Sequence, residues 1–471
     1  MDKFIKSIDD SLQRLQGRMA KIGTFCLFLG CYQQKLPSYM NDWIGLVANN
    51  CIQELHIGVC FISAEDIRRL KKVIVDELDF IDIGAFNLEI LHCEKLSYEL
   101  ELSLLVCNNL KKLRLSSPIT NQWIQEPFDK FQSLEILHLE FIKSSTESEI
   151  ELKGGFESLE NLECEGKVIF ELTCHLCIPN LPKLKKVEVY YLDGIVIEAS
   201  NLEILDCTIL SGNLEPGALL CNNLKELIVH SNPTIINQCI QQVFAKFLQL
   251  ETLHLDYNFS SYEPYRISII ISRHQLKSLG LSVSGDPEAI EINAPNLKSY
   301  RFSSKTVPSS LLMNASSLQE AIFELHMEDI FDIDTEWFLN LLKYLMMFKN
   351  HKFLCLTISL MRKENYEALL NGLLWCCHPK TLSVPLENER NRELLKFLYK
   401  AFTKEEDSFR RSSHCNWRHH LKDVKIVGLE VVDEKGLESL LTFEGYKVTF
   451  ELTWGAEDKG LESLLTFEGY N

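Results

Sequence analysis

Apolar residues recur in short phrases along the middle of the chain, separated by polar positions. Typical copies are NLEILHC from Asn87, SLEILHL from Ser133 and NLKELIV from Asn223. Leucine or a similar residue fills the second, fifth and seventh positions of each phrase, and polar residues fill most of the others. Because successive side chains of a strand point to opposite faces, the phrase predicts a short strand with one buried face.

The phrase repeats at a nearly regular interval. Its first leucines are Leu88, Leu110, Leu134, Leu159, Leu184, Leu202, Leu224, Leu250, Leu276, Leu297 and Leu318. A period of roughly twenty to twenty-nine residues with the spacing L-x-x-L-x-L is the signature of leucine-rich repeats. One copy cannot bury its apolar face alone, but stacked copies bury a continuous core. We therefore predict an α/β fold, a leucine-rich-repeat solenoid with a curved parallel sheet and an irregular convex side.

The irregularity follows from two departures from the usual repeat. The asparagine that usually follows the second leucine by five residues is present only as Asn232 and Asn258. Cysteine or another residue replaces the third leucine in several copies, as at Cys93, Cys164 and Phe302. We expect uneven connections on the convex side, including the segment SSYEPYRISIIIS, and degenerate outer copies at IQELHI and HKFLCLTI.

The segments on either side of the repeats predict caps. In residues 1–50, apolar residues from Phe4 to Ile22 recur at three- and four-residue steps, which predicts an amphipathic helix. TFCLFLGCY predicts a strand and DWIGLVANN a helix. Because the ends of a solenoid need capping, we assign residues 1–50 to an N-terminal cap, 51–330 to the solenoid, 331–455 to a degenerate repeat and an α+β C-terminal cap, and 456–471 to a tail.

The C-terminal cap is predicted from helical and strand patterns. EWFLNLLKYLMMF, YEALLNGLLWCC and NERNRELLKFLYKAF favour helices, whereas LKDVKIVGLEVV and YKVTFELTW favour strands. In the last strand Val448, Phe450, Leu452 and Trp454 share one face. KEEDSFRRSSHCNWRHH is polar and predicts an exposed loop.

Charge and cysteine content narrow the functional class. The chain of 471 residues has a net charge of −18, which disfavours a nucleic-acid partner because phosphate is repelled. No apolar window is long enough for a membrane span. We also expect the protein to be a monomer. The N-terminus lacks the apolar core of a signal peptide, and 16 cysteines without such a signal favour a reducing compartment. We expect a location in the cytoplasm, the nucleus or both.

No arrangement of residues predicts catalysis. The phosphate-binding, dinucleotide-binding, metalloprotease and serine-hydrolase motifs are absent, so we expect no enzymatic activity and no cofactor. Cys174 and Cys177 have metal-ligand spacing without a second pair. A cluster at His414, Cys415, His419 and His420 is more typical of an exposed loop than of a metal site. We therefore predict no metal site.

The concave sheet face is the predicted partner-binding site, because solenoids usually bind there. Acidic residues fill one outward position in three consecutive repeats, which favours a partner with a basic patch; the alternative is the general acidity of the surface. The candidate residues are His92, Arg114, His138, Glu163, Glu188, Asp206, His254 and Arg301.

Three regions resemble the plant family of F-box proteins with leucine-rich repeats and a C-terminal FBD domain. Asp9–Gln16 with Asn41–Leu46 is similar to the segment that joins the F-box to the repeats. NLEILHC and NLEILDC are similar to the family's cysteine-bearing repeats. WCCHPKTLSV and HCNWRHHLKDVKI are similar to the FBD region.

The resemblance implies substrate recognition without ligase docking. In that family the repeats hold the substrate of a ubiquitin ligase, and the F-box binds a Skp-type adaptor. No F-box pattern occurs in these residues, so we expect a protein-interaction module that does not bind the adaptor directly. Two alternatives are a ligand-sensing fragment of an immune-type receptor and an incomplete gene product.

The last residues contain an exact duplication. KGLESLLTFEGY occupies 435–446 and again 459–470. Exact identity contrasts with the loose similarity of the other repeats, so we interpret the second copy as a recent local duplication or an assembly error. We expect its removal to leave stability nearly unchanged.

Overall fold

The computed structural model divides into two compact units, Met1–Leu250 (unit 1) and Glu251–Asn471 (unit 2). The boundary falls within the predicted 51–330 segment, and the four predicted segments stay predictions. The residues described are 2–16, 24–28, 43, 54–58, 61–64, 71–75, 80–83, 87–93, 107–117, 131–142, 149–152, 156–167, 175–192, 194–209, 219–257, 266–326, 335–346, 348, 353–359, 370–374, 378–385, 389–403, 420–427 and 447–454.

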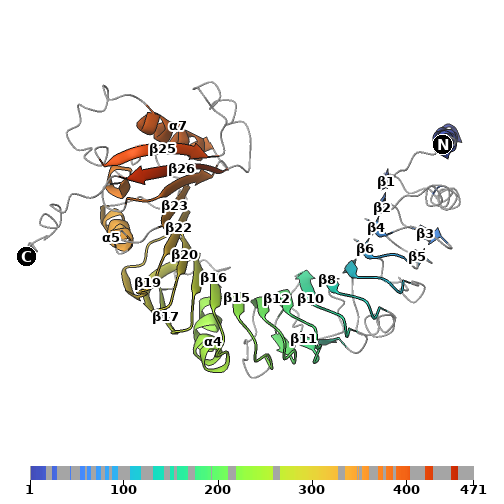
Figure 1. Ribbon diagram of the computed structural model, residues 1–471, viewed down its shortest axis with the longest axis horizontal. Coiled ribbons are helices and arrows are strands. Elements are labelled where there is room, and N and C mark those ends of the chain that lie inside the picture. Colours follow the sequence, from blue (N-terminus) through green and yellow to red (C-terminus); the bar gives the residue numbers. More distant parts are fainter. Residues whose placement is uncertain are drawn as a thin grey trace, which may run out of the picture. The chain divides into compact units, whose positions relative to one another are not determined.

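Unit 1 is a solenoid of parallel strands (Figure 1). Its main sheet pairs each strand with the next one along the chain. The strands of this sheet are β1 (Thr24–Phe28), β2 (Glu54–Gly58), β4 (Lys72–Val75), β6 (Ile90–Cys93), β7 (Lys112–Ser117), β8 (Ile136–Ile142), β10 (Asn161–Lys167), β12 (Lys186–Leu192), β14 (Ile204–Ile209) and β15 (Glu226–Ser231).

Shorter strands form the second side of unit 1. One pair is β3 (Phe61–Ala64) with β5 (Phe80–Ile83), and a three-stranded sheet joins β9 (Glu149–Glu151), β11 (His175–Ile178) and β13 (Gly194–Ile197). The unit also contains helices α1 (Asp2–Gln16) and α4 (Pro233–Lys246). The predicted N-terminal helix and the strand at TFCLFLGCY are therefore confirmed.

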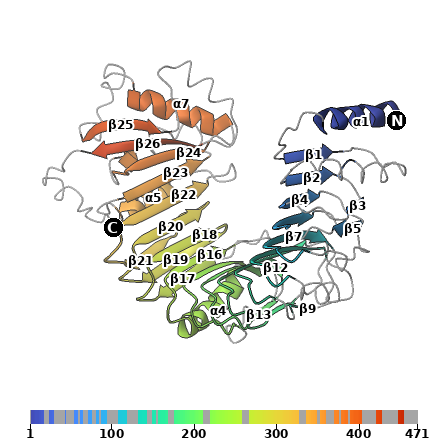
Figure 2. The same ribbon diagram turned by 45° about the vertical axis from the view of Figure 1, so that its right-hand side comes forward.

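The same pattern of parallel strands recurs within unit 2 (Figure 2). Parallel pairing joins β16 (Thr252–Tyr257), β18 (Ser278–Val283), β20 (Ser299–Ser304), β22 (Glu320–His326), β23 (Phe353–Ser359) and β24 (Thr381–Pro385). A second sheet holds β17 (Arg266–Ser272), β19 (Asp286–Asn293) and β21 (Ser310–Asn314). The segment RISIIIS forms β17 and so lies outside the main sheet, as predicted.

The C-terminal part of unit 2 changes from parallel to antiparallel pairing. Strand β26 (Lys447–Trp454) lies between β24 and β25 (Leu421–Val427) and is antiparallel to both. Val448, Phe450 and Leu452 are buried on one face of β26, as predicted. Two of the three predicted helices are present as α5 (Thr335–Met346) and α7 (Glu389–Thr403). In the third, YEALLNGLLWCC, the described residues 370–374 are helical. Both copies of KGLESLLTFEGY lie outside the described part.

The repeating phrase forms the core in both units. All eleven first leucines are buried, with 0% exposure from Leu88 to Leu297 and 7% at Leu318. The other two inward positions are buried as well, including the cysteines at 93, 164 and 207. Burial raises the pKa of the Cys93 thiol above its ordinary value, so this cysteine behaves as a small hydrophobic residue. The alternation read from the sequence is thus the alternation of the fold.

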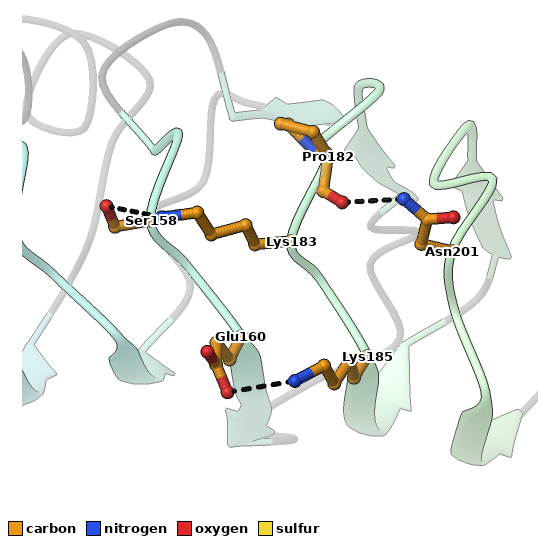
Figure 3. A network of polar contacts seen from close by, with 6 residues as sticks. All are labelled: Ser158, Glu160, Pro182, Lys183, Lys185 and Asn201. Carbon is orange, nitrogen blue, oxygen red and sulfur yellow. Dashed lines mark hydrogen bonds and ion pairs between the residues drawn. The ribbon is translucent and has the colours of Figure 1, made fainter.

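Polar contacts join consecutive repeats at the turn before each strand (Figure 3). The asparagine that precedes the first leucine donates from its side-chain amide to a backbone carbonyl of the previous repeat. Asn201 reaches the carbonyl of Pro182 at 2.7 Å, Asn223 that of Ser200 at 3.1 Å and Asn296 that of His274 at 2.9 Å. Asparagine one residue before the first leucine therefore forms hydrogen bonds that connect consecutive repeats.

Lysine or glutamate occupies the position one residue after the first leucine in every copy but the last. Ion pairs between neighbouring strands join Lys185 to Glu160 at 3.4 Å, Lys225 to Glu203 at 3.1 Å and Lys277 to Glu251 at 2.6 Å. Lys71 and Lys111 both contact Glu89 and hold the pKa of its carboxyl below the ordinary value. Each exposed pair contributes little to stability, because solvent screens the charges. Opposite charges directly across a pair of strands nevertheless favour the correct register.

Two local structures explain single polar residues noted in the sequence. Asn232 is the N-cap of α4: its Oδ1 accepts from the backbone N–H of Ile235 at 3.0 Å, and Pro233 follows at the first helical position. Near the N-terminus, the buried Trp43 donates its indole N–H to Asp9 of α1. Of the helix predicted at DWIGLVANN, only Trp43 is among the described residues. Asn258 lies outside the described residues.

Candidate partner-binding face

The sixth position of the repeating phrase lies between the second and third core positions and points outward. In unit 1 the residues at this position form a continuous row. Strand pairing places the candidate residues opposite one another in an unbroken series. We call this series the unit 1 row; its members are His92, Arg114, His138, Glu163, Glu188 and Asp206. We call the face of the main sheet that carries this row the open face, because the core residues point to the opposite face. The predicted alignment is therefore confirmed.

The same position in unit 2 forms a different row. Its members are His254, Gly280, Arg301, Ile322 and Cys355, in that order of strand pairing. The imidazole of His254 lies where a side chain at Gly280 would stand, so a Cβ atom there would clash with it. Arg301 is exposed. His254 and Arg301 thus lie in one row, two strands apart with Gly280 between them.

His138 and Glu163 form a close pair within the unit 1 row. Nδ1 of His138 lies 2.5 Å from Oε2 of Glu163, and the histidine side chain is only 7% exposed although it is on the open face. Among the described residues, Nε2 of His138 is buried without a hydrogen-bond partner. Such an atom is uncommon, because buried polar groups are normally hydrogen-bonded.

The other two carboxylates of the row also have contacts from neighbouring positions. Oε1 of Glu188 lies 2.8 Å from the ammonium group of Lys186 on the same strand. Asp206 accepts a hydrogen bond from the hydroxyl of Tyr190 at 3.1 Å, and its other oxygen lies 3.2 Å from Nε2 of His230. The side chain of Asp206 is 14% exposed. Asp206 therefore organises its neighbours rather than facing solvent.

The three carboxylates act as one negative centre. The hydrogen bond with Glu188 raises the pKa of Lys186, and the charges of Glu188, Asp206 and Glu163 raise it further. Burial raises the pKa of Tyr190 above its ordinary value, and the same three carboxylates add to the shift. Both effects have the sign expected of a negative potential, which stabilises an ammonium group and opposes a phenolate.

A strand irregularity beside the row was missed by the sequence reasoning. Register shifts between Val189 and Leu192 of β12, and Tyr191 there has a φ of 60° and is 47% exposed. Bulges of this kind redirect side chains and are common near functional sites. The only signal in the sequence is the pair Tyr190–Tyr191, where alternation would place the second tyrosine in the core.

Metal-ligating side chains were searched for in the described residues. Among them, no group of three or more histidine, cysteine, aspartate or glutamate side chains is arranged to hold a metal ion. Cys174, His414, Cys415 and His419 lie outside those residues. His420 is described, and its ring centroid lies 6.1 Å from that of His378.

No family model matches the chain, and no curated protein matches it either. In the part of the chain that the structure describes, no helix combines the length and apolar character needed to cross a membrane.

Proposed function

We propose that this chain is a protein-binding module that holds a partner protein on the open face of unit 1. The observation that supports the proposal is the unit 1 row, in which charged side chains occupy consecutive strands in register. Parallel strands lie about 4.8 Å apart, so the row offers a series of polar contacts at a fixed spacing. Extended faces of this kind are the usual binding surfaces of solenoids.

The finer identity is part of the same proposal. The L-x-x-L-x-L phrase, now seen in spatial register, supports a leucine-rich-repeat solenoid. The resemblance to plant F-box proteins with leucine-rich repeats and an FBD domain supports a role like that of their substrate-recognition part. Under this proposal the partner is a protein, and the described chain supplies recognition rather than catalysis.

Site-specific photo-cross-linking tests the proposal. A photoreactive amino acid is placed in the full chain at Thr208, which follows Asp206 on the open face, or at Val196 on β13 of the second sheet. Val196 is the matched control because it is half-exposed like Thr208 and belongs to the same unit. We expect one partner protein to be cross-linked from Thr208 and not from Val196. Equal cross-linking from both positions, or from Val196 alone, would contradict the proposal.

A further inference from the structure

The unit 1 row changes sign along its length. The exposed Arg114 is followed by His138, then by Glu163 and Glu188, each on the next strand. With strands about 4.8 Å apart, Glu163 lies roughly 9.6 Å and Glu188 roughly 14.4 Å from Arg114 along the row. The row therefore offers one cationic and two anionic groups at defined intervals.

Exposure identifies the carboxylates that a partner can reach. The side chains of Glu163 and Glu188 are 38% and 26% exposed, whereas that of Asp206 is 14% exposed. A carboxylate has about four acceptor positions, so the contact between Lys186 and Glu188 does not exhaust the acceptor capacity of Glu188. That contact shows that the row already holds an ammonium group from this chain.

His138 supplies a second observation that does not depend on the acidic residues. Its side chain is more than nine-tenths buried and directs Nδ1 at Glu163, while Nε2 has no hydrogen-bond partner among the described residues. The row thus contains a polar atom whose bonding is incomplete, at the position where its charge changes sign.

The spacing distinguishes between two forms of partner. Residues i, i+7 and i+10 of an α-helix share one face and lie at 0, about 10.5 and about 15.0 Å along its axis. These values agree within about 1 Å with the intervals of the row. Same-face residues of an extended chain recur about every 6.7 Å, so none falls within about 2 Å of the position of Glu163.

We propose that the unit 1 row binds a partner α-helix with an acidic residue at position i and lysine or arginine at i+7 and i+10. The acidic residue lies opposite Arg114, and the basic residues lie opposite Glu163 and Glu188. This inference rests on the proposed function, because it specifies the partner of the same face.

Two synthetic peptides of identical composition test the spacing. Both are alanine-rich helices with one glutamate and two lysines; one has lysines at i+7 and i+10, and the other at i+5 and i+9, on the opposite face. Binding to the full chain is measured by fluorescence anisotropy at low ionic strength, and helicity by circular dichroism. We expect the first peptide to bind about tenfold or more tightly than the second. Equal affinity overturns the inference, because it indicates unspecific charge attraction.

Two double variants locate the binding. E163Q/E188Q removes both accessible carboxylates, and E135Q/E157Q removes two exposed carboxylates of unit 1 that are outside the row. Both change the net charge equally, so only the first is expected to reduce affinity for the i+7, i+10 peptide, by about tenfold. Unchanged circular dichroism and melting temperature show that the variants are folded. An equal loss in both variants, or no binding of either peptide to the wild-type chain, overturns the inference.

The outcome is separable from that of the proposed function. If a partner is cross-linked from Thr208 and the peptides do not bind, the open face binds a protein of another form. If the peptides bind as expected and no partner is cross-linked at Thr208, the helix specificity stands and the proposed function fails.

Discussion

Units 1 and 2 use the same inward positions and differ at the outward position between them. In both, the first, second and third apolar positions of each phrase are buried. In unit 1 the outward row holds charged residues and histidine from His92 to Asp206, with Ile74 and Ile228 beyond its two ends. In unit 2 it includes Gly280, Ile322 and Cys355. The inward positions are thus apolar in both units, whereas the outward positions vary, and specificity can be built there.

The cores differ in a second respect. In unit 1, leucine, valine and cysteine fill the three inward positions, whereas unit 2 contains an aromatic cluster. Tyr300, Phe302 and Phe323 from the sheet contact Tyr344 of α5 and Phe348, with ring centroids 4.9–6.5 Å apart. Aromatic side chains are large enough to connect the sheet to a helix behind it. In unit 2 this aromatic cluster joins the main sheet to α5.

The largest expected effect is on the free energy of unfolding, when an inward residue of unit 2 is truncated and compared with its outward neighbour. Phe323 is fully buried and contacts Tyr300, Phe302, Tyr344 and Phe348. Phe323→Ala should lower the free energy of unfolding by about 3–5 kcal/mol, because it creates a cavity in the aromatic cluster. The control Ile322→Ala, on the partly exposed row, should have a much smaller effect. Chemical denaturation followed by circular dichroism measures both; similar losses would contradict the distinction between the two positions.

A smaller effect tests the polar contact inside the same cluster. The hydroxyl groups of Tyr300 and Tyr344 lie 2.9 Å apart and are buried, and burial raises the pKa of both tyrosines above the ordinary value. Tyr344→Phe leaves the hydroxyl of Tyr300 without this partner and should lower the free energy of unfolding by about 1–3 kcal/mol.

The double variant of these tyrosines is the control. Tyr300→Phe/Tyr344→Phe removes both hydroxyls together and should be closer in stability to the wild type than Tyr344→Phe alone. The comparison is made by urea denaturation at neutral pH, where both tyrosines are protonated. A double variant that loses the sum of the two single effects would show that the hydroxyls do not interact.

The smallest effect tests the outward row of unit 2. Gly280→Ala adds a Cβ atom where the imidazole of His254 lies, so the ring must leave its position. A displaced, off-rotamer side chain costs about 0.5–1.5 kcal/mol, and that loss should disappear when Gly280→Ala is made in a His254→Ala background. Thermal denaturation of the four proteins gives the coupling. If Gly280→Ala costs the same in both backgrounds, the close approach does not determine the choice of glycine.

Part of the candidate site could be predicted because it follows from strand alternation. Once the L-x-x-L-x-L phrase is aligned, the residues at 114, 138, 163, 188 and 206 must share an outward row, and the strand pairing confirms this. The partners of these residues could not be predicted. The contacts of Asp206 with Tyr190 and His230 depend on which strand positions become neighbours and on the side-chain conformations there.

Some contacts had a visible signal that the sequence reasoning did not use. The Lys–Glu pairs between repeats occupy the position after the first leucine, where lysine or glutamate recurs along the chain. The asparagine bonds likewise occupy the position before it. For Tyr191 the pair Tyr190–Tyr191 was the only signal, and its exposure results from a shift in register within β12.

The sequence by itself determined that this protein is a stacked array of short strands and which side chains form its core. Burial of apolar residues at fixed positions in every copy is a local property, repeated often enough to be read directly. Only the tertiary structure decided how the outward charges are paired, how deeply His138 is buried and where aromatic residues replace leucine against a helix. These features depend on contacts between residues in different repeats, and such contacts exist only after the strands have stacked.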